Sequence, residues 1–220
     1  MLEVIATADV AGESAAFIGS ALRQTTARGN RASFAVSGGT TPWQALQKLA
    51  TAQLDWPSID IYQVDERVVP ADSPDRNWRG LRESLLDRVP AVGHAMPVDE
   101  TDLIRAAERY AMSLPANLDV VQLGLGSDGH TASLVPADPV CGVNDRAVAV
   151  TDPYQGSRRM SLTFPPINRA STIVWIVTGA AKQEALAKLI AGDRSIPAGC
   201  VERSNATVFA DEAALGRQEL

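Results

Sequence analysis

The sequence predicts an α/β fold in which a mostly parallel sheet is flanked by helices. Short apolar runs of strand length alternate with segments of about ten residues or more whose apolar residues repeat at helical spacing. Such alternation is typical of parallel sheets joined by helical crossovers. The 220 residues suffice for one hydrophobic core, and no linker, internal repeat or low-complexity segment divides them. We therefore expect one domain over residues 1–220.

Each strand is predicted from a short apolar run bounded by glycine, proline or polar residues. The expected strands are residues 4–6, 32–36, 59–64, 120–123, 147–150, 160–164, 172–177 and 207–209. The third run ends in Asp65-Glu66-Arg67. These three charges fit either a solvated edge of the sheet or the wall of a ligand crevice.

Each helix is predicted from apolar residues three and four positions apart, together with start and stop signals. Asp9 is expected to cap the first helix, and Pro42 to stand in the first turn of the second. The expected helices are residues 10–28, 42–50, 78–88, 99–113, 165–169, 180–191 and 211–215. His94 lies in a stretch with glycine and proline, so we expect it in a loop.

Composition and charge narrow the classes of partner. With 45% hydrophobic and 21% charged residues the chain is ordinary for a soluble protein, and its net charge of −6 argues against a nucleic-acid-binding surface. No apolar run approaches the ~18 residues of a membrane span, and the N-terminus lacks a signal-peptide pattern. Cys141 and Cys200 are interpreted as reduced thiols of a cytoplasmic protein, although one disulfide between them stays open.

The stretch after residues 120–123 carries the most chemistry. Gly124, Gly126 and Gly129 fall within six residues, and Asp128 and His130 stand two apart. The pattern matches the G-x-G-x-x-G of dinucleotide-binding loops, but a proline follows too soon for the long helix that such a loop opens. A G-x-S-x-G nucleophile elbow is excluded because its first glycine is a leucine here. A plain strand-end turn with a surface histidine stays open as well.

We favour the hypothesis that His130 is a general base at the carboxyl end of a central strand, where open α/β sheets bind ligands. An imidazole can take a proton from water and return it to a leaving oxygen. Asp128 is placed to orient that ring. This pair predicts hydrolysis with no cofactor, no metal and no covalent intermediate, and the sequence offers no cluster of metal ligands.

A second loop has the composition of an anion site. The run SGGTTP at residues 37–42 joins a predicted strand to a predicted helix. Backbone N–H groups and the positive end of the helix dipole would face an anion there, and the hydroxyls add donors. It is not a Walker A loop, and an ordinary turn with capping threonines fits equally well. Lys182 opposes the dipole of the helix at 180–191, so it faces either a bound anion or solvent.

Together these motifs resemble the 6-phosphogluconolactonase family. The resemblance covers residues 36–190 and rests on SGGTTP at 37–42, Asp65-Glu66-Arg67 with Asn77, the GxGxDGHTAS run at 124–133, Arg159-x-Ser161-x-Thr163 through Ile167-Asn168, and Gly179-x-x-Lys182. It implies a Rossmann-like sheet of the phosphosugar isomerase/deaminase type. It also implies hydrolysis of 6-phospho-D-glucono-1,5-lactone to 6-phospho-D-gluconate in the pentose phosphate pathway. As partners we expect this phosphorylated sugar lactone, no nucleic acid and no membrane, and we expect a monomer.

Carried over by position, the resemblance implies a role for each candidate residue. His130 would be the base that activates water, Asp128 would support it, and Arg67 would face the substrate. The other implied substrate contacts are Gly38, Gly39, Thr40 and Lys182 around the phosphate, with Asp65 and Arg159 beside the sugar. Whether Arg158 or Arg159 contacts ligand stays open, as does the choice between Arg67 and loop N–H groups for the oxyanion.

Two alternatives remain. Glucosamine-6-phosphate deaminases share the first loop and Asp65, but their Asp-Gly-His run continues to an Asn-Glu-Pro triplet whose carboxylate assists the histidine. Here residues 133–136 read SLVP and offer no carboxylate. The second alternative is a non-catalytic phosphosugar-binding module. Phe209 stands where family members often carry tryptophan, which puts the packing of the last strand in doubt.

Overall fold

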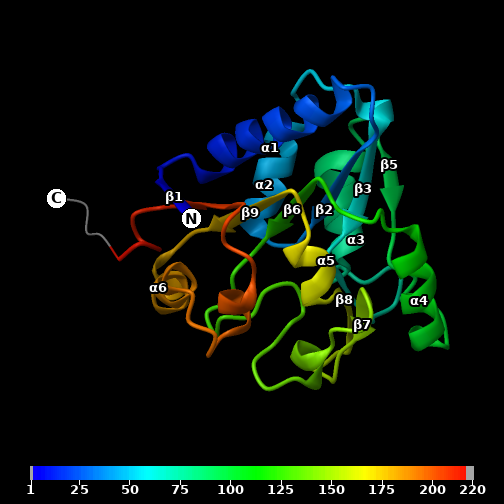
Figure 1. Ribbon diagram of the computed structural model, residues 1–220. Coiled ribbons are helices and arrows are strands. Elements are labelled where there is room, and N and C mark those ends of the chain that lie inside the picture. The colour runs from blue at the N-terminus through cyan, green and yellow to red at the C-terminus, as the bar shows by residue number, and fades with distance from the viewer. Residues whose placement is uncertain (1, 217–220) are drawn as a thin grey trace.

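The predicted parallel sheet is the largest element of the structure, a computed structural model that describes residues 2–216 (Figure 1). Within those residues it has seven strands in the order β1-β10-β9-β6-β2-β3-β5, and every neighbouring pair is parallel. The strands are β1 (Glu3–Ala6), β2 (Ala32–Val36), β3 (Ile59–Gln63), β5 (Val92–His94), β6 (Val120–Leu123), β9 (Thr172–Val177) and β10 (Ala206–Ala210). The predicted class, a mostly parallel sheet flanked by helices, is confirmed.

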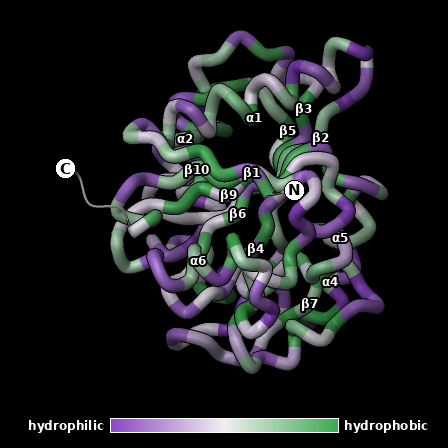
Figure 2. Tube along the Cα trace, turned by 60° about the vertical axis from the view of Figure 1, so that its left-hand side comes forward, coloured by the Kyte–Doolittle hydropathy of each residue, from purple (hydrophilic) through white to green (hydrophobic). Residues whose placement is uncertain are grey.

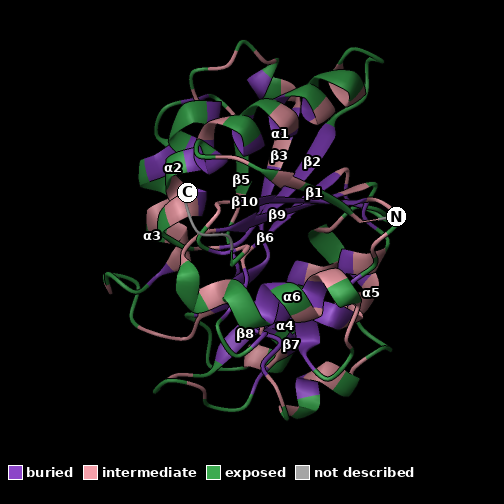
Figure 3. Ribbon diagram, turned by 90° about the vertical axis from the view of Figure 1, so that its left-hand side faces the viewer, coloured by how far each residue is buried: buried purple, intermediate pink, exposed green. Residues whose placement is uncertain are grey.

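Helices cover both faces of this sheet (Figure 3). One face carries α1 (Val10–Thr26), α2 (Thr40–Leu49) and α3 (Asn77–Leu81), which continues as a π-helical turn (Arg82–Leu86). The other carries α4 (Leu103–Ser113), α5 (Phe164–Asn168) and α6 (Gln183–Ala191). Short 3₁₀ turns lie at Trp56–Ser58, Pro139–Gly142, Ala180–Lys182 and Pro197–Cys200.

The central strands are apolar without alternation because both of their faces are buried. In β6, Val120 packs into the core under α1 and α2, whereas Val121 packs into the core on the opposite face. The same alternation between cores continues along β9, where Trp175 and Ile176 belong to opposite faces. These strands are correspondingly green in the hydropathy view (Figure 2). No helix within residues 2–216 is both long and apolar enough to cross a membrane.

A second, three-stranded antiparallel sheet was not predicted. It consists of β4 (Asp65–Arg67), β8 (Arg159–Leu162) and β7 (Val148–Val150), with β8 in the middle. It lies on the α4 side of the large sheet (Figure 1). Of the two interpretations left open for residues 65–67, the solvated edge is wrong, because these residues form a strand in which Asp65 is 6% and Glu66 0% exposed.

Buried hydrogen bonds explain how a charged strand is tolerated. The Glu66 carboxylate accepts from Gln63 Nε2 at 2.8 Å and from the backbone N–H groups of Asn77 and Trp78 at 2.8 and 2.7 Å. A buried carboxylate is costly unless it is satisfied in this way. Glu66 thereby ties β4 to the first turn of α3, and it sets the position of the neighbouring Asp65 and Arg67.

Several expected boundaries are also corrected. α4 begins at Leu103 rather than 99, because the Asp102 side chain caps it by accepting from the Arg105 N–H at 3.0 Å. The expected helix at 211–215 is only a turn, in which the Asp211 carboxylate accepts from Ala214 N and from Gly179 N.

His94 is a strand residue of β5 and not a loop residue. Its Nε2 lies 2.9 Å from Asp60 Oδ1, and its ring stacks on Tyr62 with centroids 4.4 Å apart. These contacts hold it at the edge of the sheet, where β5 pairs with β3.

Candidate active site

A cleft of about 400 Å³ opens at the carboxyl ends of the central strands. The chain runs outward from β2 to β3 and β5, then returns to place β6 on the other side of β2. The loops after β2 and β6 both line the cleft, which therefore lies where the strand order reverses, the usual ligand position in open α/β sheets. Eight of the nine candidate residues line it, and the ninth, Asp128, stands behind His130.

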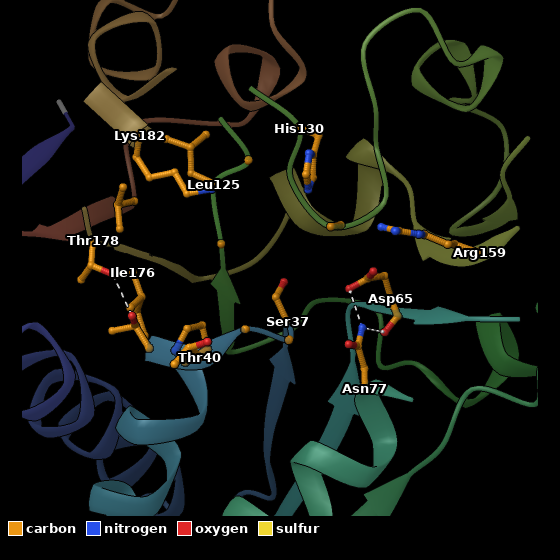
Figure 4. A pocket seen from close by; sticks show the side chains of 18 of the residues that line it. Ser37, Thr40, Asp65, Asn77, Leu125, His130, Arg159, Ile176, Thr178 and Lys182 are labelled. Carbon is orange, nitrogen blue, oxygen red and sulfur yellow. Dashed lines mark hydrogen bonds between the residues drawn. The ribbon is translucent and has the colours of Figure 1, made fainter. Parts of the chain in front are cut away.

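His130 and Asp128 form a bonded pair at one side of the cleft. Asp128 Oδ1 lies 2.6 Å from His130 Nδ1 and accepts from the His130 backbone N–H at 3.1 Å. Because an ionised carboxylate only accepts, Nδ1 carries the proton and Nε2 is left as the basic nitrogen. The ring lies among the cleft residues (Figure 4). This is the arrangement that a general base requires.

The hydrogen bonds of this pair favour the ionised form of Asp128. Burial alone would raise the pKa of Asp128. The backbone N–H and ring of His130, together with the Tyr154 hydroxyl, outweigh burial and hold that pKa below its ordinary value. Asp128 is therefore a permanent anion at neutral pH, and it keeps the imidazole in one tautomer.

The glycines of this loop serve close packing around the histidine. A Cβ on Gly126 would lie 2.1 Å from His130 Nδ1, so any other residue there would displace the histidine ring. Gly126 N–H also donates to the His130 carbonyl at 2.8 Å, and Gly129 has φ +85°. No helix follows within residues 124–136, where turns and one bridge between Thr131 and Leu134 occur instead. The loop thus lacks the helix that a dinucleotide-binding turn needs.

Asp65 also lines the cleft, and it contacts the loop that carries His130. Its Oδ2 accepts from Ser133 Oγ at 2.6 Å, and its carbonyl accepts from Asn77 Nδ2 at 3.0 Å. Burial raises the pKa of Asp65, although the Ser133 hydroxyl and the Arg159 charge act against that rise. These contacts join β4 to the loop that carries His130.

Arg159, not Arg158, faces the cleft. Arg158 is exposed and donates from Nε to the Thr151 carbonyl at 3.1 Å, outside the cleft lining. Arg159 is 5% exposed, and its guanidinium points toward the middle of the cleft (Figure 4). Its Nε has no hydrogen-bond partner in the described part of the chain, and burial lowers its pKa.

Arg67 is the antiparallel neighbour of Arg159 and also lines the cleft. Its Nη1 donates to the Asp75 carbonyl at 2.9 Å, and the side chain is 37% exposed. The two guanidinium groups make this wall locally basic in a chain of net charge −6. Such a pair suits a substrate that carries or develops negative charge.

The opposite side of the cleft is made largely of backbone donors and one ammonium. α2 begins at Thr40, and Gly39 at its N-cap has φ +136° and no side-chain capping bond among the described residues. Gly38 must be glycine because a Cβ would lie 2.4 Å from Asn77 Oδ1. Lys182 has no ion pair within residues 2–216, and it lies on the same side as Thr40 (Figure 4). A helix N-terminus with a facing lysine is suited to phosphate.

Some residues at the site were not among the candidates. Ser37 lines the cleft with a buried Oγ that has no partner in the described residues, and Thr178 Oγ1 lies 2.7 Å from Thr41 Oγ1. Ser37, Asn77 and Ser133 fall inside the motifs above, so those motifs already pointed to them. Tyr154, which contacts Asp128, lies in an irregular stretch with no pattern to reveal it. No group of three or more His, Cys, Asp or Glu side chains is arranged for a metal within residues 2–216.

Comparison with known proteins identifies the family. A sequence model described as "Glucosamine-6-phosphate isomerases/6-phosphogluconolactonase" matches residues 6–210. A 6-phosphogluconolactonase from Synechocystis sp. is 40% identical over 171 residues, covering 71% of this chain and 70% of that protein.

Solved structures agree. The crystal structure of 6-phosphogluconolactonase from Thermotoga maritima has a TM-score of 0.82 at 27% identity, covering 95% of this chain and 98% of that one. A monomeric glucosamine-6-phosphate deaminase has a TM-score of 0.87 at 17% identity, covering 99% of this chain and 100% of that one, a likeness of fold alone. The resemblance predicted from the motifs is confirmed, and the chain belongs to the family of glucosamine-6-phosphate isomerases and 6-phosphogluconolactonases.

Proposed function

We propose that this protein hydrolyses 6-phospho-D-glucono-1,5-lactone to 6-phospho-D-gluconate, the lactonase step of the pentose phosphate pathway. One observation carries the proposal: the cleft holds a carboxylate-bound imidazole on one side and a helix N-terminus with a lysine on the other. The first group is suited to activating water, and the second to holding a phosphate. The lactonase names of the relatives support the same substrate.

The mechanism begins at Nε2 of His130. This nitrogen takes a proton from a water molecule, whose oxygen attacks the lactone carbonyl carbon. The tetrahedral intermediate carries its negative charge on the former carbonyl oxygen, and Arg159 and Arg67 supply the nearby donors. Such a donor commonly contributes ~3 kcal/mol to transition-state stabilisation. When the bond between that carbon and the ring oxygen breaks, the His130 imidazolium returns the proton to the ring oxygen, and the product is the open-chain acid.

The phosphate is held on the other side of the cleft. Gly39 and the first turn of α2 line this side and supply backbone N–H groups, and the Thr40 hydroxyl and Lys182 add donors. The free Oγ of Ser37 lies between the two sides (Figure 4). In the proposed complex the reacting carbon of the phosphorylated sugar lies near His130, because the phosphate fixes the far end of the molecule.

A second candidate is a glucosamine-6-phosphate deaminase, which Asp65 in the cleft wall favours. Two features count against it. The Asp65 carboxylate is already bonded to Ser133, and the run after His130 supplies no carboxylate to assist the histidine. Release of ammonia from glucosamine 6-phosphate would decide for the deaminase. A non-catalytic module would instead bind 6-phosphogluconate and show no turnover of either substrate.

The test compares lactone hydrolysis by the wild type and by His130→Ala, with the spontaneous rate subtracted. We expect kcat to fall about 1000-fold, as loss of a general base commonly does. KM should change little, because the phosphate side is untouched. His94→Ala is the matched control, since His94 lies on β5 outside the cleft and its loss should leave kcat unchanged. A His130→Ala variant as fast as the wild type would refute the base assignment.

A monomeric state and a cytoplasmic location belong to the same proposal. Cys141 and Cys200 are free thiols, which fits a reducing compartment. Burial raises the pKa of Cys141 to about 11, so this thiol is protonated and unreactive at neutral pH.

Light scattering coupled to gel filtration tests the oligomeric state, and a mass near 23.3 kDa is the expected result.

A further inference from the structure

Tyr154 stands at the tip of the hairpin between β7 and β8. Its N–H donates to the Ser157 carbonyl at 3.0 Å, and the Ser157 N–H donates back at 3.4 Å. The two residues between them, Gln155 and Gly156, have φ of +51° and +89°. Positive φ at both central positions is typical of the tight hairpin turns that match the twist of their strands. The turn therefore fixes the direction in which Tyr154 projects.

Tyr154 contacts three parts of the cleft wall at once. Its hydroxyl donates to Asp128 Oδ2 at 3.0 Å. Its ring meets the His130 ring at 67° with centroids 5.7 Å apart. The Arg159 guanidinium lies over the face of the Tyr154 ring, 5.0 Å from its centroid, at a distance where cation–π attraction acts.

Gln155 links the Tyr154 hydroxyl to Arg159. Its Nε2 donates to the Tyr154 hydroxyl at 3.2 Å, and its Oε1 accepts from Arg159 Nη2 at 3.3 Å. The phenol oxygen thus both accepts and donates, and donation is directed to Asp128. A hydrogen-bonded chain runs from Arg159 through Gln155 and Tyr154 to Asp128, and from there to His130.

We propose that Tyr154 is a positioning residue that holds the His130 imidazole and the Arg159 guanidinium in fixed positions relative to each other. This inference rests on the proposed lactonase function. Asp128 Oδ1 serves His130, and without the Tyr154 hydroxyl its Oδ2 has no other protein donor among the described residues. The carboxylate would then turn more freely, and the imidazole with it. The ring of Tyr154 has a separate role, because the Arg159 guanidinium packs against its face.

The hydroxyl also helps to lower the pKa of Asp128. Its bond to Oδ2 withdraws charge from the carboxylate, so removing the hydroxyl leaves Asp128 more basic. Asp65, Arg67, Arg159 and Lys182 also line the cleft around the imidazole. Removing the Tyr154 hydroxyl changes the charge of none of these four groups. The acid limb of the pH profile of kcat/KM should therefore move to higher pH when the hydroxyl is lost.

The experiment separates the hydroxyl from the ring with Tyr154→Phe and Tyr154→Ala. Tyr154→Phe keeps the ring under Arg159, so we expect a loss of kcat of roughly 10- to 30-fold, as for one hydrogen bond to a charged group. KM should stay near the wild-type value, and the acid limb should move upward. Tyr154→Ala should add a rise in KM, because Arg159 loses its support.

Tyr62→Phe is the matched control, since it removes a hydroxyl that donates to the Ser113 carbonyl away from the cleft. It should leave kcat, KM and the pH profile unchanged. Circular dichroism confirms that each variant is folded, and if Tyr154→Ala does not fold, Tyr154→Phe decides alone. An active wild type with a Tyr154→Phe variant of identical kcat and pH profile overturns the inference. An inactive wild type overturns the proposed function instead.

Discussion

The two sides of the cleft are built in opposite ways. The phosphate side, from Gly38 to Thr40 with Lys182, offers backbone N–H groups and an ammonium that have no capping side chain or ion pair within residues 2–216. On the catalytic side nearly every polar group is bonded to another. Asp128 is held by both His130 and Tyr154, and Asp65 is held by Ser133.

The difference shows how each side contributes to function. Unpaired donors on the phosphate side gain their partner only when an anion binds, so they contribute mainly to affinity. The bonded groups on the catalytic side are already oriented, so they contribute mainly to the rate of the chemical step. Substitutions on the phosphate side should therefore raise KM, and substitutions on the catalytic side should lower kcat.

Of the substitutions that test this division between the two sides, Gly126→Ala should give the largest effect, and it acts on the catalytic side alone. The new methyl carbon would lie 2.1 Å from His130 Nδ1 and 2.5 Å from Asp128 Oδ1, so the two side chains must separate. A displacement near 1 Å commonly costs about 100-fold in rate, and we expect a loss of that size in kcat. Steady-state kinetics should show little change in KM.

Gly142→Ala is its control, because a Cβ at that glycine meets nothing within 4 Å. It should leave both constants unchanged. If Gly126→Ala instead raised KM and spared kcat, the division between the two sides would be wrong.

The two sides also differ in how far the sequence predicts them. The phosphate side follows from local rules, because a strand, a Gly-Gly pair and a helix start are adjacent in the chain. The pairing of Asp128 with His130 is equally local and was predicted. Two other contacts on the catalytic side are not local: Tyr154 is 26 positions from its partner Asp128, and Ser133 is 68 positions from its partner Asp65.

Non-local pairing also explains the main errors. Asp65-Glu66-Arg67 contains no apolar residue and was not predicted as a strand, yet it pairs with β8 almost 100 positions later. Its burial depends on Gln63 and the α3 N-terminus, which no periodicity reveals. His94 was placed in a loop for the same reason, because its partners Asp60 and Tyr62 lie on another strand.

Lys182→Ala tests the phosphate side and should have the next largest effect. The ammonium has no ion pair in the described chain, so its removal breaks no ion pair there. It does remove one charged contact to the phosphate. We expect KM to rise about 30-fold, as for one hydrogen bond to a charged group, while kcat stays within about twofold. Inhibition by inorganic phosphate should weaken in parallel.

Lys188→Ala provides the comparison on α6, the helix that directly follows Lys182, since Lys188 pairs with Glu184 at 2.7 Å and does not line the cleft. It should not alter KM. A fall in kcat with unchanged KM in Lys182→Ala would place the lysine at the reacting carbon and not at the phosphate.

Asp65→Asn should give the smallest effect. We expect this substitution on the catalytic side to make the protein more stable and less active. Burial raises the pKa of Asp65, so the folded protein binds this proton more tightly than the unfolded chain does. The buried charge therefore costs stability above the raised pKa, and this cost disappears as pH falls toward the ordinary value. We expect Asp65→Asn to increase the free energy of unfolding by about 1 kcal/mol at pH 8, a gain limited by the lost attraction to Arg159.

Urea unfolding at pH 8 and at successively lower pH measures this difference, and the gain should shrink as the pH falls through the raised pKa toward the ordinary value. Asp72→Asn, at an exposed residue, should change neither value. The lactonase rate of Asp65→Asn should fall even though the protein is more stable, because the side chain no longer accepts in the same way from Ser133 and no longer attracts Arg159. A variant that is less stable than the wild type at pH 8 would contradict this prediction. It would mean that the attraction between the Asp65 charge and its neighbours contributes more to stability than burial of that charge costs.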